Sequence, residues 1–263
     1  MNDKYEMSSL PEDIRRLTEG KPFRAENIGM SDSAVYIFED MVLKIENDTD
    51  NVRKTAEMME WLGGRLPVPR VIEQAAYGEK YCTLMNKIKG KMSCDEYYLE
   101  RPKELVRLLA EGLKMLWSVD ISDCPRDRGL PVELAEARLR VEAGLTFEAG
   151  SPAEKEFGSP VALLRWLEDA YPEYDPVLSH GDYCLPNIFL DGDRISGFID
   201  LGDCGTADRW RDIALCCRSL KHNTDGTYGK VYEGYNEDML FDELGICPDR
   251  EKLRYYTLLD ELF

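Results

Sequence analysis

His180-Gly181-Asp182-Tyr183-Cys184-Leu185-Pro186-Asn187 is the most informative stretch of this 263-residue sequence. It contains one carboxylate, Asp182, and a carboxamide five positions later, Asn187. The apolar segment Gly197-Phe198-Ile199-Asp200-Leu201-Gly202 then supplies a second carboxylate, Asp200. Oxygen ligands of this kind suit Mg²⁺, and phosphoryl transfer also needs an acidic residue that orients the attacking hydroxyl. The pattern therefore indicates a phosphotransferase that uses a magnesium–nucleotide complex.

A β-hairpin is predicted between the two motifs. Apolar residues at 188–190 and 195–199 flank the turn Asp191-Gly192-Asp193, which is a strong short-range hairpin signal. The hairpin is expected to place Asp182, Asn187 and Asp200 around one cleft. Each motif alone is also compatible with a structural role, because Asp and Asn are frequent in turns and at helix caps. The two motifs in this order, joined by a hairpin, favour the catalytic interpretation.

The spacing Asp-x-x-x-x-Asn matches the protein-kinase catalytic loop, with His-Gly-Asp where kinases have His-Arg-Asp. Together with Ile199-Asp200-Leu201-Gly202, the sequence resembles the aminoglycoside 3′-phosphotransferases, which are relatives of the protein kinases. The resemblance covers nearly the whole chain and implies a two-lobed, kinase-like α+β fold. A small lobe with an antiparallel sheet is expected at residues 1–88, with a hinge at 86–88, followed by a mainly helical lobe at 89–263.

The resemblance also implies the reaction and its participants. ATP or GTP with Mg²⁺ would donate a phosphoryl group to a hydroxyl of an aminoglycoside, the 3′-OH, and so confer antibiotic resistance. Asp182 would orient or deprotonate the hydroxyl, while Asn187 and Asp200 would bind Mg²⁺. Residues expected to contact the nucleotide are Lys44 at the phosphates, Ser31 in the preceding loop, Val42 against the base, and the backbone of Asn86 and Ile88 in the hinge.

Lys44 is the one charged residue in the predicted strand from Met41 to Ile45, as expected for a lysine that reaches the nucleotide phosphates. In kinases a glutamate on the next helix holds this lysine. That helix is predicted here at residues 50–62, but the family position is occupied by Thr55. Glu57 lies about 200° further round the helix and cannot simply substitute. The departure leaves the partner of Lys44 unidentified and keeps a degenerate, non-catalytic nucleotide-binding protein as an alternative.

The C-terminus carries a second functional signal. The chain ends Asp260-Glu261-Leu262-Phe263, which gathers two side-chain carboxylates and the terminal carboxylate where the helix dipole disfavours them. Folding does not require three anions at this end of the chain, whereas a polycationic ligand would bind to them. The resemblance likewise implies that Glu261 and Phe263 contact the acceptor, with Arg218 on the substrate side. A frayed, solvated terminus is the alternative.

Composition limits the possible partners. A formal net charge of −18 disfavours nucleic acid or an anionic membrane and suits a cationic small molecule. The eight cysteines form no Cys-x-x-Cys pair and are expected to be reduced, as in a cytoplasmic protein. Neither a signal peptide nor a membrane span is expected. A kinase for another cationic or sugar hydroxyl remains an alternative, and the sequence specifies neither the ATP or GTP preference nor the oligomeric state.

Helices are also predicted beyond the hinge. They include a buried helix at 102–119, a helix capped by Thr206 that runs to about Lys221, a helix at 228–244 and a final helix at 249–263.

Overall fold

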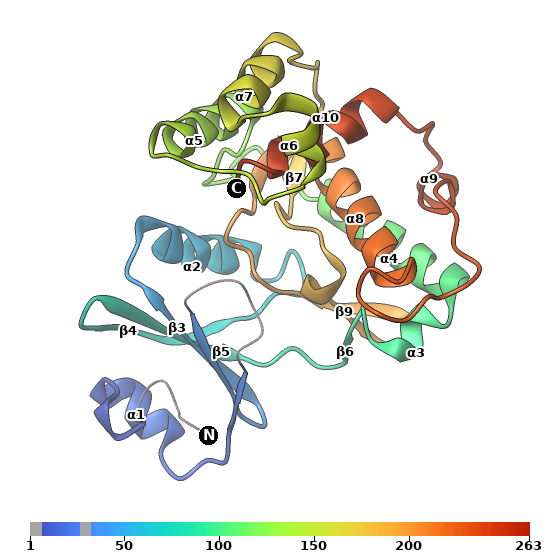
Figure 1. The fold of residues 1–263 in the computed structure, drawn as a ribbon. Helices are drawn as coiled ribbons and strands as arrows, with labels where there is room; N and C mark the ends of the chain where they lie inside the picture. The colour runs from blue at the N-terminus through green and yellow to red at the C-terminus, as the bar shows by residue number, and fades with distance from the viewer. Residues whose placement is uncertain (1–6, 27–32) are drawn as a thin grey trace.

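The computed structural model of the chain describes residues 7–26 and 33–263. An antiparallel sheet with the strand order β1-β2-β3-β5-β4 forms the N-terminal part, and helices dominate the remainder (Figure 1). The α+β architecture expected from the resemblance is present. The sheet strands are β1 (Arg24–Glu26), β2 (Ala34–Ile37), β3 (Met41–Asn47), β4 (Val71–Tyr77) and β5 (Lys80–Asn86).

Alternation along the central strand β3 explains why its two faces differ. Leu43 and Ile45 are fully buried in a core cluster with α1 (Glu12–Thr18), because successive side chains of a strand point to opposite faces. Val42, Lys44 and Glu46 occupy the opposite face and are only partly buried. The strand pairing sets Val42 opposite Met85 and Lys44 opposite Thr83. The face of the sheet that carries Lys44 is therefore the one that does not pack against α1.

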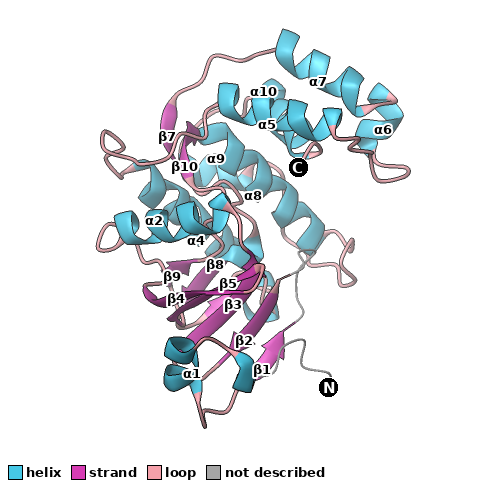
Figure 2. Ribbon diagram, turned by 90° about the vertical axis from the view of Figure 1, so that its left-hand side faces the viewer, coloured by secondary structure: helices cyan, strands magenta, loops and turns pink. Residues whose placement is uncertain are grey.

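Helix α2 (Asp50–Leu62) connects the two parts of the molecule. Its buried residues Met58, Met59 and Leu62 belong to the same core cluster as the apolar face of α4 (Pro102–Trp117). In Figure 2, α2 lies between the strands of the N-terminal sheet and the helical part. The helix is consequently anchored on the helical side as well as next to the sheet.

The helical part contains small strand pairings that shape the loops between them. The predicted hairpin is present as β8 (Ile188–Asp191) and β9 (Arg194–Phe198), with β6 (Lys91–Met92) beside β8. The further elements are α3 (Glu96–Leu99), α5 (Leu130–Glu142), α6 (Pro152–Phe157), α7 (Pro160–Asp169), β7 (Pro176–Ser179), β10 (Gly205–Asp208), α8 (Arg209–Thr224), α9 (Met239–Leu244) and α10 (Arg250–Asp260).

Two helix predictions were wrong in their bounds. Thr206 lies in β10, which pairs with β7, and Asp208 caps α8 by accepting a hydrogen bond from the Trp210 amide. The predicted helix at 228–244 is reduced to α9, because residues 228–238 form turns in which Gly229 and Gly234 adopt positive φ. Both errors arose from local signals that long-range strand pairing and glycine conformation override.

Candidate active site

The loop between β7 and β8 is held by a buried carboxylate on α8. Asp212 is fully buried, and its two oxygens accept hydrogen bonds from the backbone amides of His180, at 2.7 Å, and Gly181, at 3.0 Å. Burial raises the pKa of Asp212, although His180 and the donated hydrogen bonds oppose the shift. The two amides and the carboxylate satisfy each other in a buried region, which fixes the start of the loop.

Gly181 allows this loop to approach the segment that follows Asp200. Its φ is +86°, and a Cβ at this position would lie 2.2 Å from the carbonyl oxygen of Asp203. Any larger residue would therefore combine an unfavourable backbone conformation with a steric clash. The glycine at the position where kinases have arginine is thus required by the close packing of this loop on the segment around Asp203.

Asp182 and Asn187 form a direct pair. The side-chain amide of Asn187 donates hydrogen bonds to the Asp182 carboxylate, at 2.8 Å, and to the Asp182 backbone carbonyl, at 3.0 Å. Both Asn187 donors are directed at Asp182, so the side-chain oxygen of Asn187 is the atom left to accept or to bind a cation. The Asn187 carbonyl also accepts from the Ile199 amide at 3.0 Å, which places the residue before Asp200 beside this pair.

Asp200 has an unusual backbone and meets the N-terminal part of the chain. Among the described residues it is the only non-glycine with positive φ, 59°. Such conformations cost about 1–3 kcal/mol and persist where the surroundings enforce them. Its side chain accepts a hydrogen bond from the Lys44 ammonium at 3.2 Å. Sequence positions 44 and 200 are therefore brought together in the fold.

The partner of Lys44 was not identified from the sequence. In the structure its ammonium lies 2.8 Å from a Glu46 oxygen on the same strand. Burial alone would lower the pKa of Lys44, but Asp200 and Glu46 outweigh it and the pKa is raised. Thr55 instead donates its hydroxyl to the Asn51 carbonyl within α2, at 2.7 Å. Glu57, the substitute considered above, forms no ion pair with Lys44 in the described parts of the chain.

Residues 86–88, the predicted hinge, differ in whether their backbone amides already have acceptors. The Asn86 amide is already donated to the Arg70 carbonyl at 3.1 Å, and the Lys87 amide to Asp40 at 3.0 Å. Within residues 7–26 and 33–263, no acceptor takes the Ile88 amide. The Ile88 side chain packs on Gly197, where an added Cβ would lie 2.6 Å from it. Of these three residues, Ile88 is therefore the one whose backbone amide has no acceptor in the described structure.

A groove of about 420 Å³ lies beside residues 86–89. It is lined by residues 86–89 and by the β8–β9 hairpin, including Arg194 and Ser196. Its volume is within the range of small-molecule sites, but its lining includes neither Lys44 nor Asp200. Val42 faces the same side of β3 as Lys44, and Ser31 lies outside the described residues.

The acidic C-terminus is better compensated than the sequence suggested. Asp260 pairs with Arg218 at 2.5 Å, and a main-chain oxygen of Phe263 accepts a hydrogen bond from Arg140, whose guanidinium also lies over the Phe263 ring. Two of the three acidic groups at this end of the chain, those of Asp260 and Phe263, therefore already have intrachain partners. Burial raises the pKa of Glu261, and Arg218 opposes this shift.

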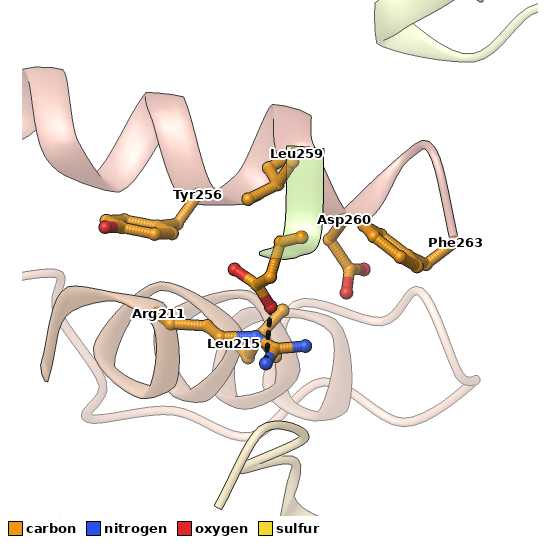
Figure 3. Close-up of a pocket in the computed structure, with 7 residues that line it drawn as sticks. Arg211, Leu215, Tyr256, Leu259, Asp260 and Phe263 are labelled. Atoms are coloured by element: carbon orange, nitrogen blue, oxygen red, sulfur yellow. Dashed lines mark ion pairs between the residues drawn. The ribbon is translucent and has the colours of Figure 1, made fainter. Parts of the chain in front are cut away.

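Figure 3 shows Asp260 and Phe263 at the end of α10, beside the side of α8 that carries Arg211 and Leu215. The cavity between them has a volume of about 10 Å³, enough for about one water molecule and far too small for an aminoglycoside.

Comparison with known proteins agrees with this geometry. A profile of the family described as "Phosphotransferase enzyme family" matches residues 25–256. The chain is 36% identical to an aminoglycoside 3′-phosphotransferase of Enterococcus faecalis, over 95% of this chain and 97% of that protein. A Staphylococcus aureus protein of the same name is 35% identical with the same coverage.

The chain belongs to the aminoglycoside 3′-phosphotransferase family. A crystal structure of an aminoglycoside 3′-phosphotransferase of type VIII is similar to this phosphotransferase with a TM-score of 0.79, at 27% identity and covering 95% of this chain and 97% of that one. An aminoglycoside phosphotransferase of Streptomyces rimosus gives the same TM-score at 23% identity, which supports the fold alone. No described helix of the phosphotransferase is long and apolar enough to cross a membrane.

Sequence reasoning about this phosphotransferase missed Asp212 and Arg126. Asp212 had a local signal, since it is an acid next to the apolar run at residues 213–217 of a predicted helix. Arg126 had none: its guanidinium donates to the Gly202 carbonyl and to the Asn51 side chain, both at 2.6 Å. It therefore ties α2 to the segment that follows Asp200, and this contact exists only in the folded chain.

Proposed function

We propose that this phosphotransferase transfers the γ-phosphoryl group of a magnesium–nucleotide complex to the 3′-hydroxyl of an aminoglycoside and thereby confers resistance. The observation that carries the proposal is the proximity of two pairs, Asp182 with Asn187 and Asp200 with Lys44. They are joined where the amide of Ile199, the residue before Asp200, donates to the Asn187 carbonyl. Its substrate class is supported by relatives that are named aminoglycoside 3′-phosphotransferases over 97% of their length.

Asp182 is the proposed acid–base residue. Asn187 holds one oxygen of its carboxylate, Oδ2, at 2.8 Å and so fixes the orientation of the group. A carboxylate fixed in this way can accept a hydrogen bond from the acceptor hydroxyl and align its oxygen with the γ-phosphorus. Phosphoryl transfer requires such positioning more than covalent participation of the protein.

Mg²⁺ is the proposed metal, and the residues present fit it. Within the described ranges, no group of three or more His, Cys, Asp or Glu side chains converges on a metal site. Mg²⁺ tolerates this, because it commonly binds one or two protein oxygens together with substrate phosphates and water. The Asp200 carboxylate and the remaining Asn187 oxygen would hold the ion, which when bound neutralises phosphate charge. Lys44, charged at neutral pH, would bind the phosphates.

Carboxylates near the end of α10 are proposed to bind the ammonium groups of the acceptor. Glu261 has no basic partner of its own in the described structure apart from the more distant Arg218. The overall charge of −18 would also attract a polycation. Arg218 and the Phe263 carboxylate are proposed to border the same substrate region.

Expression in an aminoglycoside-susceptible bacterium tests the function. We expect growth at antibiotic concentrations that kill the host with an empty vector, and no growth with the Asp182→Ala variant expressed at the same level. Equal susceptibility of the parent chain and the variant would contradict the proposal.

Asp200→Ala is expected to weaken binding of the magnesium–nucleotide complex by at least tenfold, because it removes the carboxylate ligand of the metal. Calorimetric titration with and without Mg²⁺ measures the effect. The weakening should be seen only with Mg²⁺ present. An unchanged dissociation constant in Mg²⁺ would instead assign Asp200 to the backbone structure of its loop.

A short uncharged extension after Phe263 tests the terminal carboxylate. Every side chain is kept, but the carboxylate is displaced, so we expect the KM for the aminoglycoside to rise about threefold or more while the nucleotide KM is unchanged. Arg140→Gln is the matched control, because it removes the intrachain partner and leaves the carboxylate in place. If both variants raise the aminoglycoside KM equally, the terminus acts through packing and not through the substrate.

A further inference from the structure

Lys44, the lysine proposed to bind the nucleotide phosphates, has its carboxylate partner on its own strand and not on the next helix. In other kinase-like enzymes, a glutamate on the helix after this strand orients the lysine. Here Lys44 and Glu46 are two residues apart on β3, so their side chains leave the same face of the sheet. Their charged groups are 2.8 Å apart, and each side chain is 25% exposed. The pair is thus partly shielded from solvent, where an ion pair is stronger than on an open surface.

Helix α2 does not supply this partner. Thr55 occupies the position expected for the glutamate, and its hydroxyl is used within the helix, on the Asn51 carbonyl. All of α2 lies within the described residues, and none of its acidic side chains forms an ion pair with Lys44. Helix α2 instead contacts the segment after Asp200 through Arg126, whose guanidinium donates to the Asn51 side chain and to the Gly202 carbonyl.

Asp200, the other carboxylate beside Lys44, has a different proposed task. It lies 3.2 Å from the ammonium and is 53% exposed, compared with 25% for Glu46. A carboxylate that binds a divalent cation directs its charge to the metal and is less available to a lysine. Among the residues that the structure describes, Glu46 is then the carboxylate left to restrain Lys44 while the nucleotide is bound.

We propose that Glu46 is a positioning residue that orients Lys44 toward the nucleotide phosphates, in place of a glutamate on α2. The inference rests on the proposed role of Lys44 in nucleotide binding. Because both members of the pair are on one strand, displacement of α2 does not separate them. The lysine is therefore oriented whatever the position of that helix, unlike in kinases that are switched by helix movement.

Nucleotide binding by a set of variants tests the proposal without any acceptor. Glu46→Gln keeps the size of the side chain and should raise the dissociation constant for Mg–ATP about three- to tenfold. In a Lys44→Ala background the same change should have no further effect, because Glu46 acts through Lys44. Glu79→Gln, at an exposed turn of the same sheet, is the control and should bind as the parent does.

Relocating the carboxylate gives the sharper result. Thr55→Glu alone should change the dissociation constant by less than about twofold, since Lys44 already has a partner. Combined with Glu46→Gln, it should return binding to within about twofold of the parent. Three results would each overturn the proposal. They are unchanged nucleotide binding in Glu46→Gln, an equally large loss of affinity when Glu46→Gln is added to Lys44→Ala, and no recovery of affinity when Thr55→Glu is added to Glu46→Gln. Failure to phosphorylate an aminoglycoside would contradict the proposed function but leave these binding results interpretable.

Discussion

Asp182→Ala is expected to lower kcat by about 10²–10⁴-fold, because a positioned acid–base group contributes that much to a proton-coupled step. Asn187 donates to its carboxylate at 2.8 Å, so the orientation of the group is built into the folded loop. Binding of the nucleotide should stay within about threefold of the parent, since Asp182 is proposed to act on the acceptor hydroxyl. Steady-state kinetics with an aminoglycoside and Mg–ATP, alongside nucleotide titration, measures both quantities.

Asp193→Ala is a suitable control for Asp182→Ala. Asp193 is an exposed carboxylate in the turn between β8 and β9, and its removal should leave kcat unchanged. If Asp182→Ala retained kcat within threefold of the parent, Asp182 would not be the catalytic residue.

Asp212→Ala is expected to reduce the free energy of unfolding by about 2–5 kcal/mol, because two buried backbone amides would each lose their acceptor. These amides belong to His180 and Gly181, so kcat should fall as well through misplacement of Asp182. Urea unfolding and steady-state kinetics on the same preparation measure the two effects.

Two further variants sharpen this test. Asp212→Asn keeps the shape and one acceptor oxygen but turns a donor toward the other amide, so it should lie between the parent and Asp212→Ala. Asp242→Ala, at an exposed position of α9, should change stability by less than about 0.5 kcal/mol. A fully stable and active Asp212→Ala variant would mean that the loop does not depend on this carboxylate.

The parts of the fold that the sequence predicted are those with local signals. The hairpin at 188–198 is marked by alternating apolar residues and an Asp-Gly turn, and α2 by its helical pattern and the glycines that follow it. Asp182, Asn187 and Asp200 were predicted because their spacing has a chemical meaning. The pairing of β7 with β10 was missed because residues 177 and 207 come together only through the tertiary fold.

The partner of Lys44 shows why the remaining site residues were harder to predict. The kinase pattern points to the helix position that Thr55 occupies. Strand alternation alone, however, places the side chain of Glu46 on the same face as Lys44. Whether an acid two residues away turns toward the lysine depends on the sheet register and on what else is near, and neither is visible in the sequence. The same applies to Arg140, which is far from Phe263 in the sequence and binds its main-chain oxygen in the fold.

Purified protein with Mg–ATP and two matched acceptors provides the decisive comparison for the proposed function. One acceptor is an aminoglycoside with a 3′-hydroxyl, and the other is its 3′-deoxy counterpart. Phosphorus NMR and mass spectrometry of the products are expected to show one phosphoryl group on the 3′-oxygen of the first acceptor and an unmodified second acceptor. Transfer to neither acceptor, or equal transfer to both, would contradict the assignment of this phosphotransferase to the 3′-hydroxyl of aminoglycosides.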